Sequence, residues 1–281
     1  SEGGITKTHT VTSLIVTAVD PDLDTVSGTA DPATQVDIGH IYCDETGCYG
    51  YRRVIADTNG DWIADFAHVG EDSDEQDIID IKPGMGNEAR QCDNDGECTT
   101  YGWYVYNPYV EASPTSDWVH AREWLTGTLM TLTIDDPSNG AGVDYTTTAT
   151  MGQAPWNPGD PNDIVADFNL NGYNVKPGDI VTASGNGQSK TLTVSQLTVT
   201  GFDVQADTVL GTGMAGGQIQ ICANVPNRCI TRYVTPDGSG NWTANYAVAG
   251  VPPDDTDMFD VQPGSSGWAA EYELDSDRTW A

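Results

Sequence analysis

The stretch Asn59-Gly60-Asp61-Trp62-Ile63-Ala64-Asp65-Phe66 shows how the chain is built, because it recurs as Ser239-Gly240-Asn241-Trp242-Thr243-Ala244-Asn245-Tyr246. A second match has the same order in the chain. Residues 6–17 correspond to residues 189–200, at an offset of 183 residues. Matches in a fixed order at a nearly fixed spacing are typical of internal repeats. The sequence therefore predicts two copies of one domain.

The repeat divides the chain into four segments. We expect an orphan N-terminal strand over residues 1–14, a first copy over 15–108, a distinct middle domain over 109–197 and a second copy over 198–281. Thr, Val and Ile alternate with polar residues in runs of five to eight, bounded by Gly, Asn, Asp and Pro, which is the pattern of half-buried strands. The predicted fold class is all-β, with tandem β-sandwich domains.

Three stretches of the first copy carry a resemblance to a known kind of module. They are Val26-Ser27-Gly28-Thr29-Ala30, Ala33-Thr34-Gln35-Val36-Asp37-Ile38 and Ala56-Asp57-Thr58-Asn59-Gly60-Asp61-Trp62. The second copy keeps Gly240-Asn241-Trp242. The pattern resembles the bacterial Ig-like modules that form tandem arrays on cell-surface and adhesin-like proteins. The resemblance implies Ig-like sandwiches, a turn whose Trp enters the core, and a role in spacing, adhesion or polymer building. The Cys pairs and the Trp-rich middle domain depart from the usual module.

The charge of the chain is strongly negative. Eleven Lys and Arg stand against 42 Asp and Glu, giving a formal net charge of -31. Such a surface repels nucleic acids and anionic lipid surfaces, so we expect no nucleic-acid partner. The acids either keep the protein soluble in salty surroundings or bind Ca²⁺ at turns. No apolar run of about twenty residues is present, so we expect no membrane span.

Six cysteines form three close pairs, each bracketing a polar, turn-like segment. The expected disulfides join Cys43 to Cys48, Cys92 to Cys98 and Cys222 to Cys229. Zinc binding is the competing interpretation, but no pair is Cys-x-x-Cys and no His is suitably spaced. Disulfides would place the protein in an oxidising compartment, outside the cell or on its surface.

Calcium is the only cofactor for which the sequence offers candidates, because Ca²⁺ binds six to eight oxygen ligands. Three acidic clusters supply such oxygens, although none completes an EF-hand and each is also typical of a solvated turn. The candidate ligands are Asp93, Asp95 and Glu97; Asp57, Asn59 and Asp61; and Asp160 and Asp163.

The N-terminal segment is a candidate assembly strand. Its counterpart before the second copy looks like the last strand of the middle domain, but residues 6–14 follow no such domain. Likewise, residues 279–281 end where the first copy continues through residues 103–108, as if the chain were cut from a longer array. An unpaired strand can join another sheet edge, and copies of the chain are then its partners; the alternative is a frayed terminus. The assembly candidates are Thr6, Thr8, Thr10, Val11 and Leu14.

Aromatic side chains offer a second kind of contact, because Trp and Tyr rings can stack on sugars. Tyr104, Tyr106, Trp118 and Trp124 are the candidate stacking residues for surface glycans; core packing is the alternative. Asn241-Trp242-Thr243 is a glycosylation sequon, which makes Asn241 a candidate acceptor.

No catalytic motif is found, so we predict no enzyme and no catalytic residues. The sequence predicts an extracellular structural or adhesive repeat protein, a self-assembling filament or surface-array subunit joined by strand exchange. The alternative is a carbohydrate-binding module of a larger secreted protein.

Overall fold

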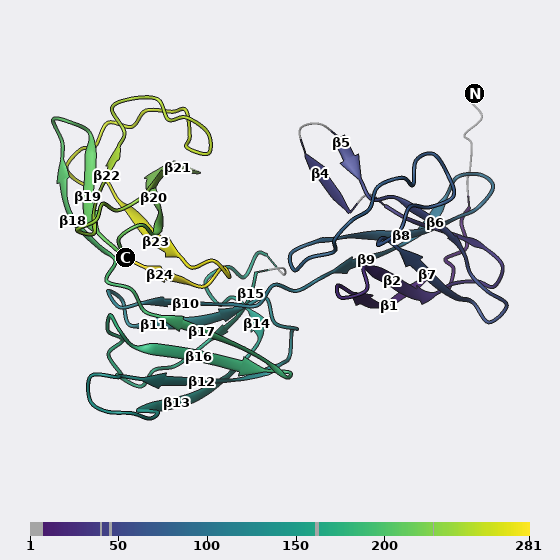
Figure 1. Cartoon of the computed structure of the whole chain (residues 1–281), viewed down its shortest axis with the longest axis horizontal. Helices are drawn as coiled ribbons and strands as arrows, with labels where there is room; N and C mark the ends of the chain where they lie inside the picture. The colour runs from purple at the N-terminus through teal and green to yellow at the C-terminus, as the bar shows by residue number, and fades with distance from the viewer. Residues whose placement is uncertain (1–7, 40, 45–46, 161–162, 227) are drawn as a thin grey trace, which may run out of the picture. The chain divides into compact units, whose positions relative to one another are not determined.

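The structure is a computed structural model that describes residues 8–39, 41–44, 47–160, 163–226 and 228–281. Strands are the only regular elements in these ranges, and they pair almost entirely antiparallel. The chain forms two compact units, residues 1–107 and residues 108–281 (Figure 1). No helix among the described residues is long and apolar enough to cross a membrane.

The first unit is one sandwich with an additional hairpin. A three-stranded sheet has the order β1-β2-β7, a four-stranded sheet has the order β6-β3-β8-β9, and β4 and β5 pair separately. The strands are β1 (Ile15–Asp20), β2 (Thr25–Thr29), β3 (Gln35–Ile38), β4 (Tyr42–Asp44), β5 (Gly47–Tyr49), β6 (Arg52–Ile55), β7 (Asp61–Asp65), β8 (Gly86–Cys92) and β9 (Cys98–Tyr104).

The core of the first unit lies between its two sheets. Alternate residues of β7 point inward, so Trp62 and Ala64 are buried while Asp61, Ile63 and Asp65 are exposed. Val36 of β3 and Trp103 of β9 meet them from the other sheet. The Trp of the repeated turn thus enters the core, as the resemblance implied.

The second unit holds the middle domain and the second copy. It contains a four-stranded sheet β13-β12-β16-β17, a three-stranded sheet β18-β19-β22 and an eight-stranded sheet β14-β15-β11-β10-β24-β23-β20-β21. The strands are β10 (Tyr109–Ser113), β11 (Trp118–Arg122), β12 (Leu129–Asp135), β13 (Tyr145–Thr150), β14 (Gly152–Gln153), β15 (Ile164–Asp167), β16 (Ile180–Gly185), β17 (Gln188–Thr193), β18 (Thr198–Asp203), β19 (Thr208–Thr212), β20 (Gln218–Val225), β21 (Arg228–Val234), β22 (Asn241–Asn245), β23 (Gly267–Tyr272) and β24 (Arg278–Trp280).

The two copies share their architecture. In the first copy, the sheet β1-β2-β7 faces the sheet β6-β3-β8-β9. In the second copy, the sheet β18-β19-β22 faces the equivalent strands β21-β20-β23-β24. Close packing explains a shared glycine: a Cβ on Gly28 would lie 2.7 Å from the ring of Trp62, and one on Gly211 would lie 2.0 Å from the ring of Trp242. Only a residue without a side chain admits the indole at this point.

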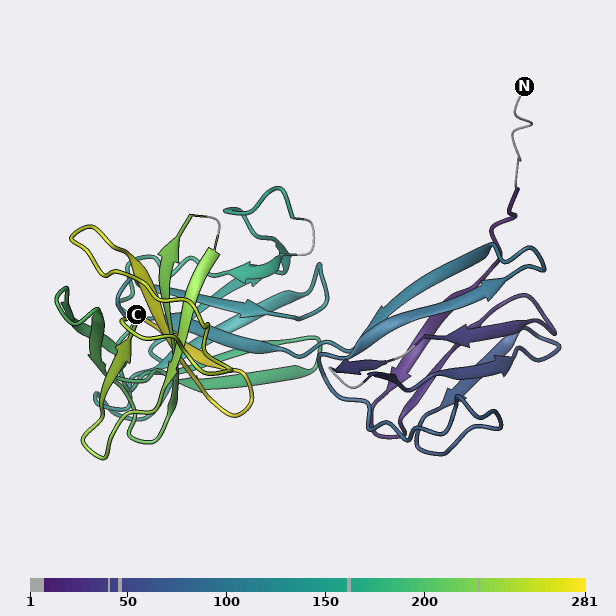
Figure 2. The ribbon, with the colours of Figure 1, turned by 90° about the horizontal axis from the view of Figure 1, so that it is seen from above.

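The second unit has two cores but one sheet common to both. Val110, Val119 and Met130 belong to the core of the middle sandwich, and Ile219 and Trp242 belong to that of the second copy. The common sheet is continuous because β24 of the second copy pairs in parallel with β10 of the middle sandwich, Glu111 opposite Arg278 and Ala112 opposite Thr279 (Figures 1 and 2). The prediction of all-β sandwich domains is confirmed, while a sheet crosses the expected boundary at residues 197 and 198.

Candidate functional site

The parallel pair β10–β24 carries the most distinctive cluster of side chains on the second unit. Strand alternation sends Val110 and Ala112 into the core and places Glu111 on the opposite face of the sheet. Antiparallel pairing sets His120 of β11 opposite Glu111, and parallel pairing sets Arg278 beside it. The joint, as we call this cluster, consists of Tyr109, Glu111, Trp118, His120, Arg122, Trp156, Arg278 and Trp280.

Glu111 is the hub of the joint. Its buried carboxylate accepts a hydrogen bond from Nε of Arg122 at 2.6 Å and another from Nε1 of Trp280 at 3.1 Å. Nδ1 of His120 lies 3.3 Å from Oε1, and Nε of Arg278 lies 3.5 Å from Oε2. Because these partners come from β11 and β24, one side chain connects the middle sandwich to the second copy.

The charges of the joint balance around this carboxylate. Burial alone raises the pKa of Glu111, but the hydrogen bond from His120 and the charges of Arg122 and Arg278 hold it at about 2. The carboxylate of Asp163 accepts a hydrogen bond from Nη1 of Arg122 at 2.7 Å. Glu111 therefore stays ionised at all ordinary pH values.

Aromatic rings cover the joint and border a shallow depression of about 460 Å³. The rings of Trp118 and His120 stack with centroids 4.3 Å apart, and Trp156 lies 4.8 Å from His120. The guanidinium of Arg278 lies 4.3 Å from the ring centroid of Tyr109. Trp156 is 50% exposed, so an apolar ring face is open to solvent beside charged groups.

Further contacts strengthen the connection between the middle sandwich and the second copy. The backbone N–H of Val110 donates to Oδ1 of Asp277 at 2.6 Å, and that of Ser195 donates to Oγ1 of Thr279 at 3.0 Å. Asp277 is fully buried, and burial raises its pKa to about 6 although the Val110 bond opposes this. Nζ of Lys190 lies 3.0 Å from a carboxylate oxygen of Asp275.

Two of the three expected disulfides are present, Cys92–Cys98 and Cys222–Cys229. Cys43 and Cys48 are opposite each other in the β4–β5 backbone pairing, but their side chains lie outside the described part of the chain. The two disulfides fit an extracellular compartment.

The predicted calcium clusters have different outcomes. Asp93 and Glu97 do come together, joined by His9 rather than by Asp95, with possible ligand atoms within 4.8 Å of one another. Oδ1 of Asp57 instead accepts the backbone N–H groups of Asn59 at 2.7 Å and Asp61 at 3.0 Å, as in an Asx turn. Asp163 pairs with Arg122, so an arginine already provides the positive charge there. The remaining candidate, Asp160, closes a backbone turn by donating its N–H to Asn157.

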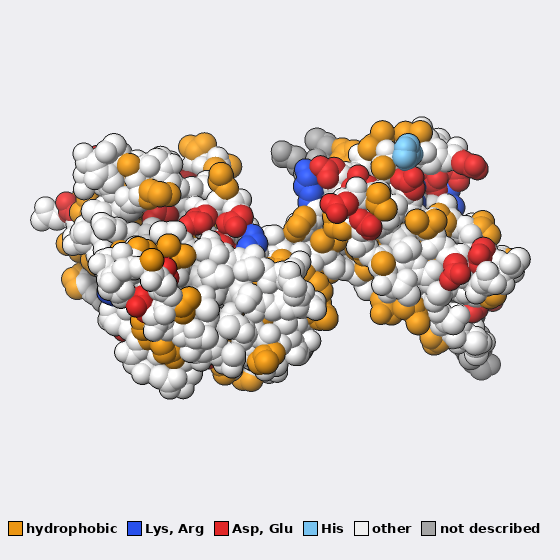
Figure 3. All heavy atoms as spheres, turned by 60° about the horizontal axis from the view of Figure 1, so that its bottom comes forward, with side chains coloured by type: hydrophobic (Ala, Val, Ile, Leu, Met, Phe, Trp, Pro, Cys, Tyr) orange, Lys and Arg blue, Asp and Glu red, His pale blue; other side chains and the backbone are white. Residues whose placement is uncertain are grey.

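Two acidic clusters that the sequence analysis did not single out could also hold a cation. They are Asp72, Asp74 and Glu75 in the first unit, and Glu273, Asp275 and Asp277 in the second. Figure 3 shows several groups of acidic side chains on the visible surface, where basic side chains are rare.

The N-terminal segment lies against its own sandwich. Thr6 is outside the described residues, and residues 8–14 contain no strand. The ring of His9 contacts Oγ1 of Thr99 at 2.9 Å, and the N–H of Thr12 donates to the same oxygen. Leu14 is buried in the first core, whereas Val11 is 77% exposed. The expected orphan strand is therefore docked at its C-terminal end, because the apolar Leu14 completes the core.

The structure does not bring the four candidate stacking residues together. Tyr104 and Tyr106 are exposed in the first unit, with ring centroids 5.8 Å apart. Trp118 belongs to the joint, but Trp124 is 1% exposed in the core of the middle sandwich, so its prediction as a stacking residue is wrong. Asn241 is exposed at the start of β22, and its glycosylation stays a prediction.

Sequence reasoning missed the roles of Glu111, His120, Arg122, Arg278 and Trp280. A signal was present in Trp118-Val119-His120-Ala121-Arg122, where every second residue is small or β-branched and the others are aromatic or charged. Such alternation predicts one face in a core and one polar, aromatic face. The pairing of β10 with β24 has no comparable signal.

No protein-family model matches the chain, and no curated protein matches it. Among solved structures, it is similar to a tetra-tandem repeat in the extending region of a large adhesion protein, with 15% identity, a TM-score of 0.22, and coverage of 95% of this chain and 71% of that chain. It is also similar to the chicken CNTN1 FN1-FN3 domains, with 10% identity, a TM-score of 0.24 and 90% of each chain covered. A third similar structure is the BSP domain of a biofilm-associated protein, with 8% identity, a TM-score of 0.22, and 92% of this chain and 62% of that chain covered.

Proposed function

We propose that the protein is an extracellular structural or adhesive repeat module whose neighbouring sandwiches form rigid pairs. The observation that carries this proposal is the eight-stranded sheet that runs from the second copy into the middle sandwich. A flexible linker would let two domains rotate freely. A shared sheet with the buried Glu111 at its centre instead resists rotation, as a rigid spacer between domains requires.

The proposal extends to self-assembly into filaments or surface arrays. Support comes from the N-terminal segment, whose Val11 is exposed while Leu14 is anchored in the core. A segment that is anchored at one end can offer its other end to pair with a neighbouring sheet edge.

Negative-stain electron microscopy of the full chain tests this assembly. We expect filaments or ordered arrays, and we expect the variant Val11→Asp to shorten them without unfolding the protein, because Val11 lies at the surface. Val248→Asp, at another exposed valine, is the matched control. Discrete monomers in every condition would overturn self-assembly. Failure of an antibody against the chain to label intact source cells would overturn the surface location.

The proposal includes a calcium site at the turn between β23 and β24. Glu273, Asp275 and Asp277 offer ligand atoms within 4.8 Å of one another. Oδ2 of the buried Asp277 has no hydrogen-bond partner within the described chain, and a cation would compensate its charge. Calcium would have to displace Lys190 from Asp275. We expect calcium to raise the melting temperature of the native chain but not that of Asp277→Asn; an equal rise in both would refute this site.

Glycan binding is the second candidate function, because Trp156 exposes its ring above the joint depression. Aromatic faces next to charged donors suit a sugar ring, which is apolar on its faces and polar at its edge. Binding to a panel of soluble and insoluble polysaccharides tests it. We expect Trp156→Ala to abolish binding and Tyr106→Ala, in the first unit, to leave it unchanged. Loss of binding with Tyr106→Ala but not with Trp156→Ala would instead place the glycan site at Tyr104 and Tyr106.

A further inference from the structure

The two copies of the repeat differ at the end of one hairpin. The hairpin β8–β9 of the first copy corresponds to β23–β24 of the second, at an offset of 180 residues. The paired residues that flank the turn are Cys92 and Cys98 in the first copy, where they form a disulfide. In the second copy they are Tyr272 and Arg278, and Nη1 of Arg278 donates to the Tyr272 hydroxyl at 3.3 Å. The second hairpin therefore presents a guanidinium group where the first has a disulfide.

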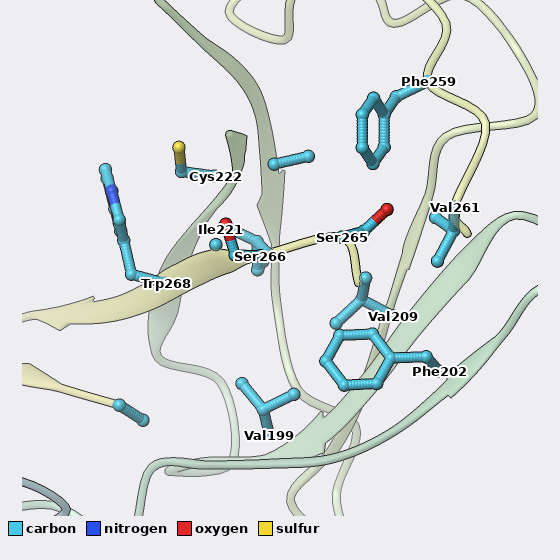
Figure 4. A pocket seen from close by; sticks show the side chains of 13 residues that line it. Val199, Phe202, Val209, Ile221, Cys222, Phe259, Val261, Ser265, Ser266 and Trp268 are labelled. Carbon is cyan, nitrogen blue, oxygen red and sulfur yellow. The ribbon is translucent and has the colours of Figure 1, made fainter. Parts of the chain in front are cut away.

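A second difference lies two residues further along the same strand. Trp280 of β24 stands at the position of Thr100 in β9. The ring of Trp280 packs against Trp268 of its own copy, with centroids 4.8 Å apart, and Glu88 takes the position of Trp268 in the first copy. Trp268 is opposite Cys222 in the sheet, beside a pocket of the second copy (Figure 4). The second copy thus positions the indole of Trp280 with its own residues, and the first copy has no ring at either position.

The two oxygens of the Glu111 carboxylate are bonded from different sandwiches. Oε1 lies 2.6 Å from Nε of Arg122 and 3.3 Å from Nδ1 of His120, both on β11 of the middle sandwich. Oε2 lies 3.1 Å from Nε1 of Trp280 and 3.5 Å from Nε of Arg278, both on β24 of the second copy. A buried acceptor without a donor costs free energy. Because Glu111 is buried, the sandwich that covers it has to supply the donors for Oε2.

We propose that Arg278 and Trp280 select which copy of the repeat joins the β10–β11 face of the middle sandwich. A copy with Cys and Thr at these positions, as in the first copy, does not form the joint. A disulfide has no N–H or O–H to donate, and a threonine side chain is shorter than an indole, so Oε2 would stay buried without a donor. An unpaired buried group set against the wrong partner is one source of specificity. The selection rests on the proposed rigid pairing and adds which partner that face accepts.

Hydrogen exchange of the full chain tests the selection. The triple variant Tyr272→Cys/Arg278→Cys/Trp280→Thr gives the second copy the hairpin end of the first, including the two cysteines that close it. We expect roughly tenfold or more faster exchange in β10, because this strand becomes a sheet edge, and native rates in β19 and β22 of the other sheet. Gln218→Ala, at an exposed residue of the common sheet, is the control and should change neither. Native rates in β10 of the triple variant would overturn the selection.

A chain with two first copies provides the converse test. Residues 15–106 replace residues 198–281, and we expect β10 to exchange as fast as in the triple variant. Adding Cys92→Tyr, Cys98→Arg and Thr100→Trp to the inserted copy should slow the exchange of β10 roughly tenfold or more. Absence of this slowing would overturn the selection even if the triple variant had unfolded its second copy.

The variant Glu111→Ala separates the selection from the rigid pairing itself. We expect faster exchange in β10 of both Glu111→Ala and the triple variant. If only Glu111→Ala exchanges faster, the rigid pairing stands and the selection by Arg278 and Trp280 is wrong. Native rates in β10 of both variants would overturn the selection together with the rigid pairing.

Discussion

Removal of the carboxylate of Glu111 is the sharpest test of the joint. The variant Glu111→Ala leaves Nε of Arg122 and Nε1 of Trp280 without their common acceptor and removes the carboxylate beside Arg278. Deleting one partner of a buried ion pair typically costs about 3–5 kcal/mol, because the remaining charge stays buried and uncompensated. We therefore expect the second unit to lose about 3–5 kcal/mol of its free energy of unfolding.

The pKa of Glu111 gives a second estimate of the same quantity. Its pKa falls from the ordinary value of 4.5 for a glutamate to about 2 in the folded protein. A carboxyl whose pKa is lowered by folding contributes stability above its unfolded pKa and loses it as the pH falls through the folded pKa. The difference corresponds to roughly 3 kcal/mol at pH 7, lost between about pH 4.5 and pH 2. The two estimates agree in order of magnitude.

Differential scanning calorimetry of the full chain measures this loss. For a unit of this size about 3 kcal/mol lowers the melting temperature by roughly 6–12 °C. Hydrogen exchange of peptides from β10 and β24 should locate the loss at the joint. The control is Gln218→Ala, an exposed residue of the same sheet. A shift no larger than that of the control, or faster exchange only in the first unit, would refute the role of Glu111.

Three further predictions concern single residues of the second unit. Gly211→Ala places a Cβ 2.0 Å from the ring of Trp242, so we expect a loss of about 1–3 kcal/mol in urea unfolding. Arg232 donates to five backbone carbonyls; a lysine has three donors, so Arg232→Lys should lose about 2 kcal/mol in the same assay. The raised pKa of Asp277, about 6, destabilises the fold above pH 6 and ceases to do so as the pH falls toward the unfolded value near 3.8. Asp277→Asn keeps the acceptor for the N–H of Val110 and removes the charge, so it should melt higher than the native chain at pH 8, with the difference vanishing near pH 4. An unchanged melting temperature at pH 8 would contradict the last of these.

Local pattern was enough to predict that the chain is built of strands. Trp62 and Trp242 are buried because alternation and the preceding turn fix which face of the strand they occupy. Pattern could not decide between core and surface for Trp124, because a single aromatic residue near a strand end suits both. It also could not decide whether Asp57 binds a cation or its own backbone, since both use the same oxygen.

The joint was beyond sequence reasoning for a different reason. Glu111 and Arg278 are brought together by a parallel pair whose strands lie far apart in the chain. Turn sequences indicate which consecutive strands form a hairpin, but no local sequence pattern indicates a parallel pair of strands that lie far apart in the chain. The burial of Leu14 could not be predicted from the sequence, because it depends on the whole core around this residue.

The chemistry of the joint favours a structural over a glycan-binding role. A sugar site needs carboxylates and guanidinium groups that are ready to bond a ligand, but both oxygens of Glu111 already accept bonds from Arg122 and Trp280. A ligand could use only ring faces such as that of Trp156 and the open side of the guanidinium groups. If glycans bind there, Glu111→Ala should therefore disturb binding only through the position of β24 relative to β10. Both oxygens of the Glu111 carboxylate are bonded within the joint, as expected for a connection that holds two sandwiches in one orientation.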